Sequence, residues 1–128
     1  MQVIDHANQD AELWRPGVKT FMRISALTKS HQLCIFEQFC DFGLGAPIHI
    51  HSVEEVLEVM EGEAEIYLGG ESQMVTANQS VVIPAGIRHG FKNVGSGILR
   101  VRATIAAAIF EAGYDDGREA SRRYNPSP

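Results

Sequence analysis

The sequence predicts an all-β sandwich or barrel, and three observations favour this fold class. Short apolar or alternating stretches follow one another at a spacing of about 8–12 residues. Glycine, proline, asparagine or serine residues separate these stretches, as turns between strands require. No amphipathic stretch of about ten residues with helical periodicity competes with them in the middle of the chain.

The expected strands each end at a turn signal. The first two, at 18–27 and 32–42, carry apolar residues without helix caps. Shorter strands are expected at 48–53, 56–60, 64–68, 73–76, 80–83, 90–93 and 98–105. The turns between them contain glycine at 43–47, 61–63, 69–70 and 95–97.

Composition indicates one compact domain. The chain has 128 residues, of which 45% are hydrophobic and 21% are charged, enough for one continuous core. A formal net charge of -5 argues against nucleic acid as the main partner, because that binding depends on a positive surface. The longest apolar run, 105–110, is far below the ~20 residues of a membrane span, so we expect no membrane contact.

The ends of the chain differ from its middle. We expect an N-terminal arm at 1–16, a barrel domain at 17–110 and a polar C-terminal tail at 111–128. Residues 1–10 are too polar for a secretory signal peptide. Cys34 and Cys40 lie in one expected strand, where six extended residues span roughly 20 Å. A disulfide needs Cα atoms within about 7 Å. Reduced thiols are therefore expected, and they indicate a cytoplasmic location.

Charge is unevenly distributed along the chain. The segment between Lys29 and Arg88 contains no lysine or arginine but many acids, whereas the segment from Arg88 to Arg102 contains bases and no acid. The favoured interpretation is that strands of the two segments lie side by side with ion pairs on the outer face. The alternative is that the acidic segment concentrates divalent cations near a site.

A histidine pattern predicts a metal site. His49 and His51 are two residues apart in an expected strand, so they project to the same side. Glu55 begins the next strand, and His89 follows a rigid turn at 84–86. Three imidazoles and one carboxylate are ligands for a first-row transition metal, whereas Ca²⁺ and Mg²⁺ prefer oxygen ligands.

Glycines and prolines around these ligands form two longer motifs. The first reads G-x5-H-x-H-x3-E-x6-G from Gly43 to Gly62, and the second reads P-x-G-x2-H-x3-N from Pro84 to Asn93. In this order the motifs resemble those of the cupin superfamily, over residues 17–105. Asn78 stands where the family usually has glycine, and asparagine tolerates the same left-handed conformation.

The resemblance implies a small double-stranded β-helix, an RmlC-like jelly-roll barrel of the cupin 2 type with little helix. It implies one divalent transition metal per chain (Fe, Mn, Ni, Zn or Cu) at His49, His51, Glu55 and His89. It also implies a homodimer. We expect a strand near 15–24 to join the partner's sheet, with Trp14 and Phe21 at the contact.

Strand alternation predicts which side chains line the barrel. Three apolar side chains share the ligands' side of their strands and should face inward: Leu57, Val59 and Phe91. Gln38 and Tyr67 are the polar candidates for the interior. Three arginines should point outward from the barrel: Arg88, Arg100 and Arg102. His6 and His31 have no partners at ligand spacing and should be exposed to solvent.

Function is predicted only by class. The favoured hypothesis is a metal-dependent enzyme, dioxygenase-like or carbohydrate-modifying, on a small organic substrate in the barrel. No residue is identified as catalytic. The alternative is a non-catalytic small-molecule-binding or sensor protein, and a structural or storage role is the third. Many different reactions occur on this fold, so the function has to be inferred from the residues of the site and not from the fold.

Overall fold

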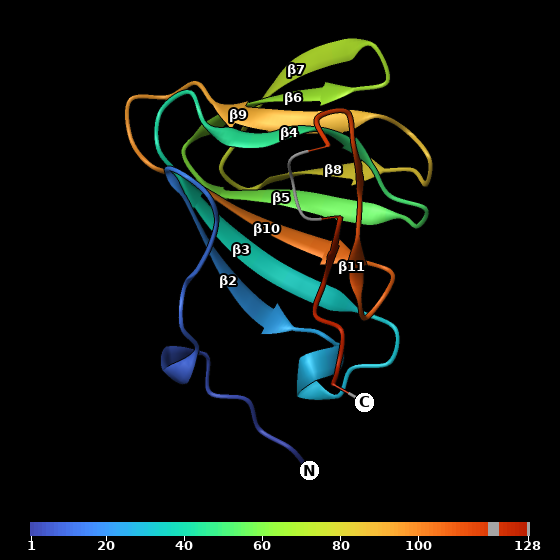
Figure 1. Cartoon of the computed structure of the whole chain (residues 1–128). Helices are drawn as coiled ribbons and strands as arrows, with labels where there is room; N and C mark the ends of the chain where they lie inside the picture. Colours follow the sequence, from blue (N-terminus) through green and yellow to red (C-terminus); the bar gives the residue numbers. More distant parts are fainter. Residues whose placement is uncertain (118–120, 128) are drawn as a thin grey trace.

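Two antiparallel sheets face one another in the computed structural model, which describes residues 1–117 and 121–127 (Figure 1). The six-stranded sheet has the order β1 (Glu12–Arg15), β2 (Val18–Ile24), β3 (Cys34–Cys40), β10 (Leu99–Ile105), β5 (Glu55–Glu61) and β8 (Gln79–Ile83). The five-stranded sheet has the order β12 (Gly113–Tyr114), β4 (Gly45–Ile50), β9 (His89–Asn93), β6 (Glu63–Leu68) and β7 (Glu71–Thr76).

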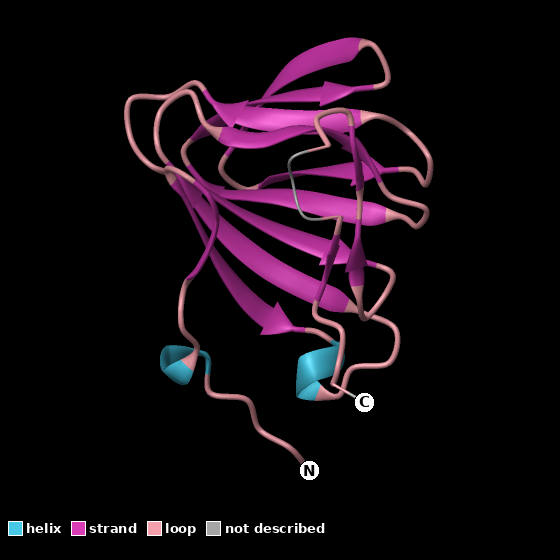
Figure 2. Ribbon diagram, in the orientation of Figure 1, coloured by secondary structure: helices cyan, strands magenta, loops and turns pink. Residues whose placement is uncertain are grey.

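Other regular structure is short. β11 (Phe110–Glu111) pairs with β13 (Arg122–Arg123), and two single 3-10 turns occur at His6–Asn8 and Ala26–Thr28. Strands dominate the described part of the chain (Figure 2). The all-β jelly-roll prediction with little helix is confirmed, and each expected strand between residues 18 and 105 is present within a few residues of its predicted ends.

Alternation along the strands separates the core from the outer surface. In β10 the buried residues Leu99, Val101, Ala103 and Ile105 alternate with half-buried ones, because successive side chains point to opposite faces. Leu57 and Val59 are buried on β5 as predicted. The core therefore fills the space between the two sheets.

Two tight turns depend on special backbone conformations. Gly62 joins β5 to β6 with φ of 89°, and a Cβ there would lie 2.7 Å from the Ile98 carbonyl oxygen. Asn78 joins β7 to β8 with φ of 69°, so the asparagine adopts the left-handed conformation predicted for it. Both turns thus keep the strands in register.

The terminal segments pack on the barrel. β1 pairs with β2, and β12 pairs with β4 beside His49. Trp14 stacks against Phe36 and Phe110 of its own chain, with ring centroids 5.0 and 4.9 Å away. β2 is hydrogen-bonded to β1 on one side and β3 on the other. The strand expected to join a partner is thus already paired, while the homodimer itself stays a prediction.

Both cysteines are free and buried, which confirms that they do not form a disulfide. Burial raises the pKa of each thiol to about 12, so both are uncharged at neutral pH. Among the described residues, no helix is long and apolar enough to cross a membrane.

Cross-strand ion pairs connect the acidic and basic segments, as the favoured interpretation predicted. Glu37 on β3 accepts hydrogen bonds from Arg23 Nε at 2.9 Å and Arg100 Nε at 2.7 Å. Arg102 bonds Glu58 across the β10–β5 pair at 2.7 Å, and Lys92 lies 3.7 Å from Glu65. Glu37 is 7% exposed, so its two arginine partners offset the loss of hydration. Arg88, Arg100 and Arg102 face outward as predicted.

We predict that Glu37→Gln lowers the free energy of unfolding by about 2 kcal/mol at neutral pH. Burial acts to raise the pKa of the Glu37 carboxyl, but hydrogen bonds from Arg23 and Arg100 hold it below 4.5. The stabilisation is therefore present above pH 4.5 and is lost as the pH falls through the folded-state pKa. Urea denaturation from pH 7 to 3 should show the free energies of unfolding of the unmodified protein and Glu37→Gln converging. Glu71→Gln, at an exposed position of β7, serves as the control. The prediction would be contradicted if the difference in free energy of unfolding between the unmodified protein and Glu37→Gln grew as the pH fell.

Candidate metal centre

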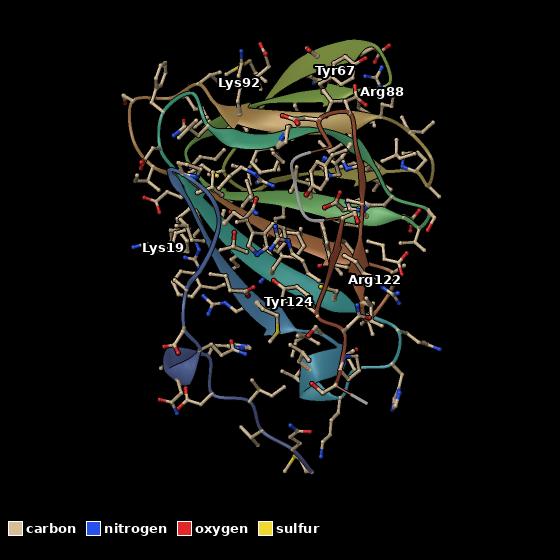
Figure 3. The ribbon with its side chains drawn as sticks, viewed as in Figure 1. Lys19, Tyr67, Arg88, Lys92, Arg122 and Tyr124 are labelled. Carbon is tan, nitrogen blue, oxygen red and sulfur yellow. The ribbon has the colours of Figure 1, made fainter. Side chains whose placement is uncertain are left out.

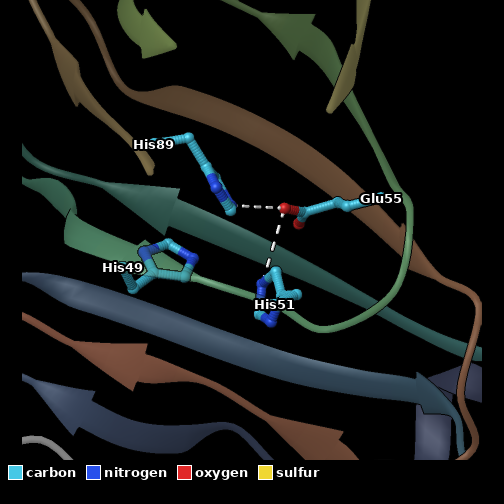
Figure 4. Close-up of side chains that lie close together, drawn as sticks. All are labelled: His49, His51, Glu55 and His89. Carbon is cyan, nitrogen blue, oxygen red and sulfur yellow. Dashed lines mark hydrogen bonds and ion pairs between the residues drawn. The ribbon is translucent and has the colours of Figure 1, made fainter. Parts of the chain in front are cut away.

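Four polar side chains meet inside the barrel. His49 lies on β4, His51 directly follows it, Glu55 begins β5 and His89 begins β9. All four are buried, between 2% and 5% exposed, and their ligand atoms lie within 4.8 Å of one another. Figure 4 shows the four side chains pointing toward one another. The structure thus brings together every residue that the sequence analysis assigned to the metal site.

Local backbone features aim these side chains inward. The register of β4 against β9 shifts between Ala46 and His49, and His49 is then paired with His89. Gly86, with φ of 78°, donates its N–H to the His51 carbonyl at 2.7 Å. The turn before His89 is therefore tied to the loop that carries His51.

Each histidine makes a hydrogen bond through Nδ1 that sets its orientation. Nδ1 contacts a backbone carbonyl in all three: Pro47 at 2.6 Å for His49, Glu111 at 2.6 Å for His51 and Ile87 at 2.9 Å for His89. A carbonyl oxygen only accepts, so Nδ1 must carry the hydrogen. Nε2 of each ring is then the atom available for a metal.

The electrostatics of the cluster centre on Glu55. Its Oε1 lies 2.9 Å from His89 Nε2 and 3.6 Å from His51 Nε2 (Figure 4). Burial acts to raise the pKa of Glu55, but the His89 hydrogen bond and the other imidazoles hold it below its usual value. Burial lowers the pKa of His49 to about 4, and it also lowers the pKa of His51. Burial opposes the His89 charge, yet the bond to Glu55 raises the pKa of His89 above its usual value. The cluster therefore contains one carboxylate and two neutral imidazoles at neutral pH.

The donor set fits a transition metal. His51 Nε2 is buried and has no hydrogen-bond partner, which is costly for an imidazole nitrogen unless another group occupies its lone pair. Three Nε2 atoms and one carboxylate oxygen are suitable ligands for a divalent first-row ion. A metal would also replace the proton shared between His89 and Glu55. The cluster fits a metal site, and the histidines outside it, His6 and His31, are exposed as predicted.

A small cavity adjoins the cluster. It measures about 20 Å³ and touches His49, Glu55 and His89, which is room for about one water. Most of its lining is apolar: Trp14, Phe36, Ala46, Leu57, Phe91, Ala103 and Phe110. Gln38 lines it as predicted and bonds Thr20 through Nε2 at 3.1 Å.

Tyr67 was wrongly expected inside. It lies on the outer face of β6, where Figure 3 places it on the same side as Lys92, because its neighbour Ile66 takes the inward position.

Sequence reasoning missed the residues that the two ends of the chain bring to this cavity. Trp14 and Arg15 come from β1, and Tyr114 comes from β12. The Tyr114 ring lies 5.1 Å from the His49 ring. Both aromatic residues stand in segments that are otherwise polar, and this contrast was the signal available in the sequence.

The fold and the buried cluster define a small β-barrel domain with a potential metal site. The chain belongs to the cupin family, because the family profile described as "Cupin domain" matches residues 42–105. The four ligands and the strands from β4 to β10 therefore lie inside the segment that carries the family's sequence pattern.

Three known proteins illustrate the relationship. The "HTH-type transcriptional regulator PuuR" of Escherichia coli K12 is 39% identical over 51 residues, which cover 40% of this chain and 28% of that protein. The chain thus spans under a third of that curated relative. Among solved structures, the polyketide cyclase RemF from Streptomyces resistomycificus matches with a TM-score of 0.76 and 19% identity, over 91% of this chain and 86% of that one. An RmlC-like cupin from Shewanella frigidimarina matches with a TM-score of 0.73 and 22% identity, over 84% and 92%. These structures confirm the RmlC-like jelly-roll fold.

We predict that the protein purified without chelator, or reloaded with Fe, Mn, Ni, Zn or Cu, holds close to one equivalent of metal. His51→Ala should reduce this below a tenth of an equivalent because it removes a buried ligand atom, Nε2, that makes no hydrogen bond within the protein. Elemental analysis is the measurement, and His31→Ala, at an exposed position, is the control. Less than a tenth of an equivalent in the unmodified protein with every metal would refute the site.

We predict that chelation lowers the melting temperature but leaves one cooperative β-sheet transition. Metal at 100 times its Kd stabilises by about 2.7 kcal/mol, which is lost on its removal. The apolar core is made of residues other than the four ligands and does not need the metal to form, so the barrel should persist. Circular dichroism with and without EDTA measures both features. Complete unfolding on chelation would show that the metal is structural.

Proposed function

We propose that this chain is a metal-dependent enzyme, dioxygenase-like or carbohydrate-modifying, that acts on a small organic substrate held in the barrel. His49, His51, Glu55 and His89 would hold one divalent transition metal. The observation that carries the proposal is the position of these ligands beside an apolar cavity in the barrel, because a purely structural site would be closed on all sides. When bound, the metal supplies Lewis-acid or oxygen-activating chemistry.

The chain's own residues prepare the site for that chemistry. The three carbonyl bonds to Nδ1 hold the imidazoles in one orientation, so little reorganisation accompanies binding. The apolar lining keeps bulk water from the site, which strengthens the charge interactions inside it. Gln38 and Tyr114 contribute polar groups to this lining, where they would contact a substrate.

A second function is favoured by one observation. The segment similar to a transcriptional regulator supports a non-catalytic small-molecule-binding or sensor role, in which the ligand is released unchanged. The same cavity would serve both functions. An enzyme would convert its ligand into a product, whereas a sensor would bind and release it unchanged.

We also propose a cytoplasmic homodimer. The two buried free thiols support a reducing compartment. β1 is an edge strand of the six-stranded sheet, and Leu13 on it is 80% exposed. Pairing this edge across a two-fold axis would cover it.

The test of the enzyme proposal is turnover by protein loaded with Fe or Mn. Enediols, flavonols, keto-uronates and dicarboxylates would be incubated with it in air and without oxygen. We expect oxygen uptake or a new product that requires the metal and disappears in His89→Ala, since this variant lacks one ligand. His6→Ala, changed on the exposed surface, is the control. Tight binding of one compound without a product would instead establish the sensor role.

A further inference from the structure

The cavity beside the metal ligands is too small for the molecules that must enter it. It has room for about one water, and the four ligands beside it are between 2% and 5% exposed. A hydrated metal ion is larger than one water, and so is any organic substrate. Part of the cavity wall must therefore move before either can reach the ligands of the folded barrel.

The cavity wall consists of inner strands and edge strands. Most of it comes from β3, β4, β5, β9 and β10, each of which is hydrogen-bonded to a neighbour on both sides. The rest comes from β1, β11 and β12, which stand at the ends of their sheets in the described part of the chain. An inner strand moves only if two ladders of hydrogen bonds break, whereas an edge strand breaks one. The part that moves is therefore one of these three edge strands.

Two of the three edge strands are anchored by aromatic side chains. Trp14 of β1 and Phe110 of β11 have ring centroids 4.9 Å apart, and Phe110 is 1% exposed. β12 differs from both, because it consists of the exposed Gly113 and the half-buried Tyr114. Glycine has no Cβ and therefore has the freest backbone, so Gly113 is a suitable hinge. β12 is thus the edge strand that moves at the smallest cost.

The residues that follow this hinge cover one ligand and reach the neighbour of a second. Tyr114 pairs with His49 in the register of β12 against β4, and the two rings lie 5.1 Å apart. The next residue, Asp115, forms an ion pair with Arg88, which directly precedes the ligand His89. These two side chains are 49% and 55% exposed, so the attraction between them is weak in water and the pair opens easily. An exposed ion pair thus holds the segment over the site.

We propose that residues 113–115 form a strap that gates the metal cavity. Figure 1 shows the segment that follows β11 crossing from the side of the six-stranded sheet to the five-stranded sheet, where β12 joins β4. Lifting the strap opens a mouth beside the ligands, through which metal and substrate enter. The inference rests on the proposed function, since it takes the four ligands to hold a metal.

The closed and open states of the strap differ in a few contacts. In the closed state, which the structure shows, Tyr114 covers His49 and Asp115 is paired with Arg88. In the open state the strand pairing of β12 with β4 is broken and the ion pair is separated. Phe110 stays in the core in both states because its ring is fully buried. The opening therefore leaves the barrel folded.

A disulfide can lock the strap in its closed state. Gly113 and Ile50 face each other across β12 and β4, and both are exposed. A Cβ added at Gly113 would lie 3.3 Å from Ile50 Cγ1. Residues directly opposite in an antiparallel pair have Cα atoms about 5 Å apart, which suits a disulfide. The double variant Gly113→Cys with Ile50→Cys should therefore form one on oxidation, since Cys34 and Cys40 are buried.

The test measures how fast the metal leaves. The full chain loaded with Co²⁺ would be mixed with an excess of EDTA, and the loss of the cobalt visible spectrum gives the release rate. We expect the oxidised double variant to release Co²⁺ about tenfold or more slowly than its reduced form, because release requires opening. A phosphine reductant should restore the faster rate. The metal content before EDTA should stay near one equivalent in both forms.

A second disulfide serves as the matched control. Glu63 and Thr76 face each other across β6 and β7, are exposed and lie away from the strap. Glu63→Cys with Thr76→Cys adds a disulfide that constrains the unfolded chain in the same way. Its oxidised and reduced forms should release Co²⁺ at about the same rate, because the strap stays able to open.

Two single variants test the closed contacts from the opposite direction. Asp115→Asn removes the ion pair and should speed Co²⁺ release at low salt, with a smaller gain at about 1 M salt, where charges are screened. Glu58→Gln, which removes the ion pair with Arg102 on the outer face, is its control. Tyr114→Ala removes the cover over His49 and should speed release about tenfold or more.

The outcomes separate this inference from the proposed function. If the unmodified protein holds no Co²⁺, the metal site and the gate fail together. If Co²⁺ binds but the oxidised and reduced forms of Gly113→Cys with Ile50→Cys release it equally fast, or both disulfides slow release alike, the metal site stands and the strap is not its gate. If the cysteines of the strap fail to pair or the variant fails to fold, an unchanged release rate in Tyr114→Ala overturns the inference.

Discussion

The hydrogen bond from each histidine Nδ1 to a backbone carbonyl is the interaction on which the site depends. It selects one tautomer and one ring orientation, so that Nε2 faces the centre of the barrel. Two of the three carbonyls, those of Pro47 and Ile87, lie two residues before their histidine. The third belongs to Glu111, at the other end of the chain. The site is therefore built from local turns and from one long-range contact.

That long-range contact couples the end of the chain to the metal ligands. The Phe110 ring lies 5.4 Å from the His51 ring, and Tyr114 stacks beside His49. Trp14 of the N-terminal segment packs on Phe110 and Tyr124. The Tyr124 hydroxyl donates a hydrogen bond to the Glu12 carboxylate at 3.1 Å. These contacts close the barrel with both terminal segments. The same segments supply two of the polar residues that line the cavity, Arg15 and Tyr114.

The sequence predicted the strands and the ligands for different physical reasons. Strands such as β10 are visible because one face is buried, which forces apolar residues to alternate with polar ones. His49 and His51 are visible because the same period places them on one side, and the two motifs fix their distance from Glu55 and His89. The terminal strands have two to four residues each, too few for a period to show. Their role at the cavity comes from pairing across the whole chain.

The position of Arg15 shows why such residues escape a sequence argument. Nothing in its neighbours predicts a cation beside a buried metal site, since Arg15 stands at the end of a four-residue strand next to a turn. It reaches the cavity because β1 folds back on β2 and brings the guanidinium to Gly45 and Tyr114. The barrel interior offers mostly apolar contacts, which bind a substrate without orienting it. Besides the four ligands, the polar residues that line the cavity are Arg15, Gln38 and Tyr114, and two of these three come from the terminal segments.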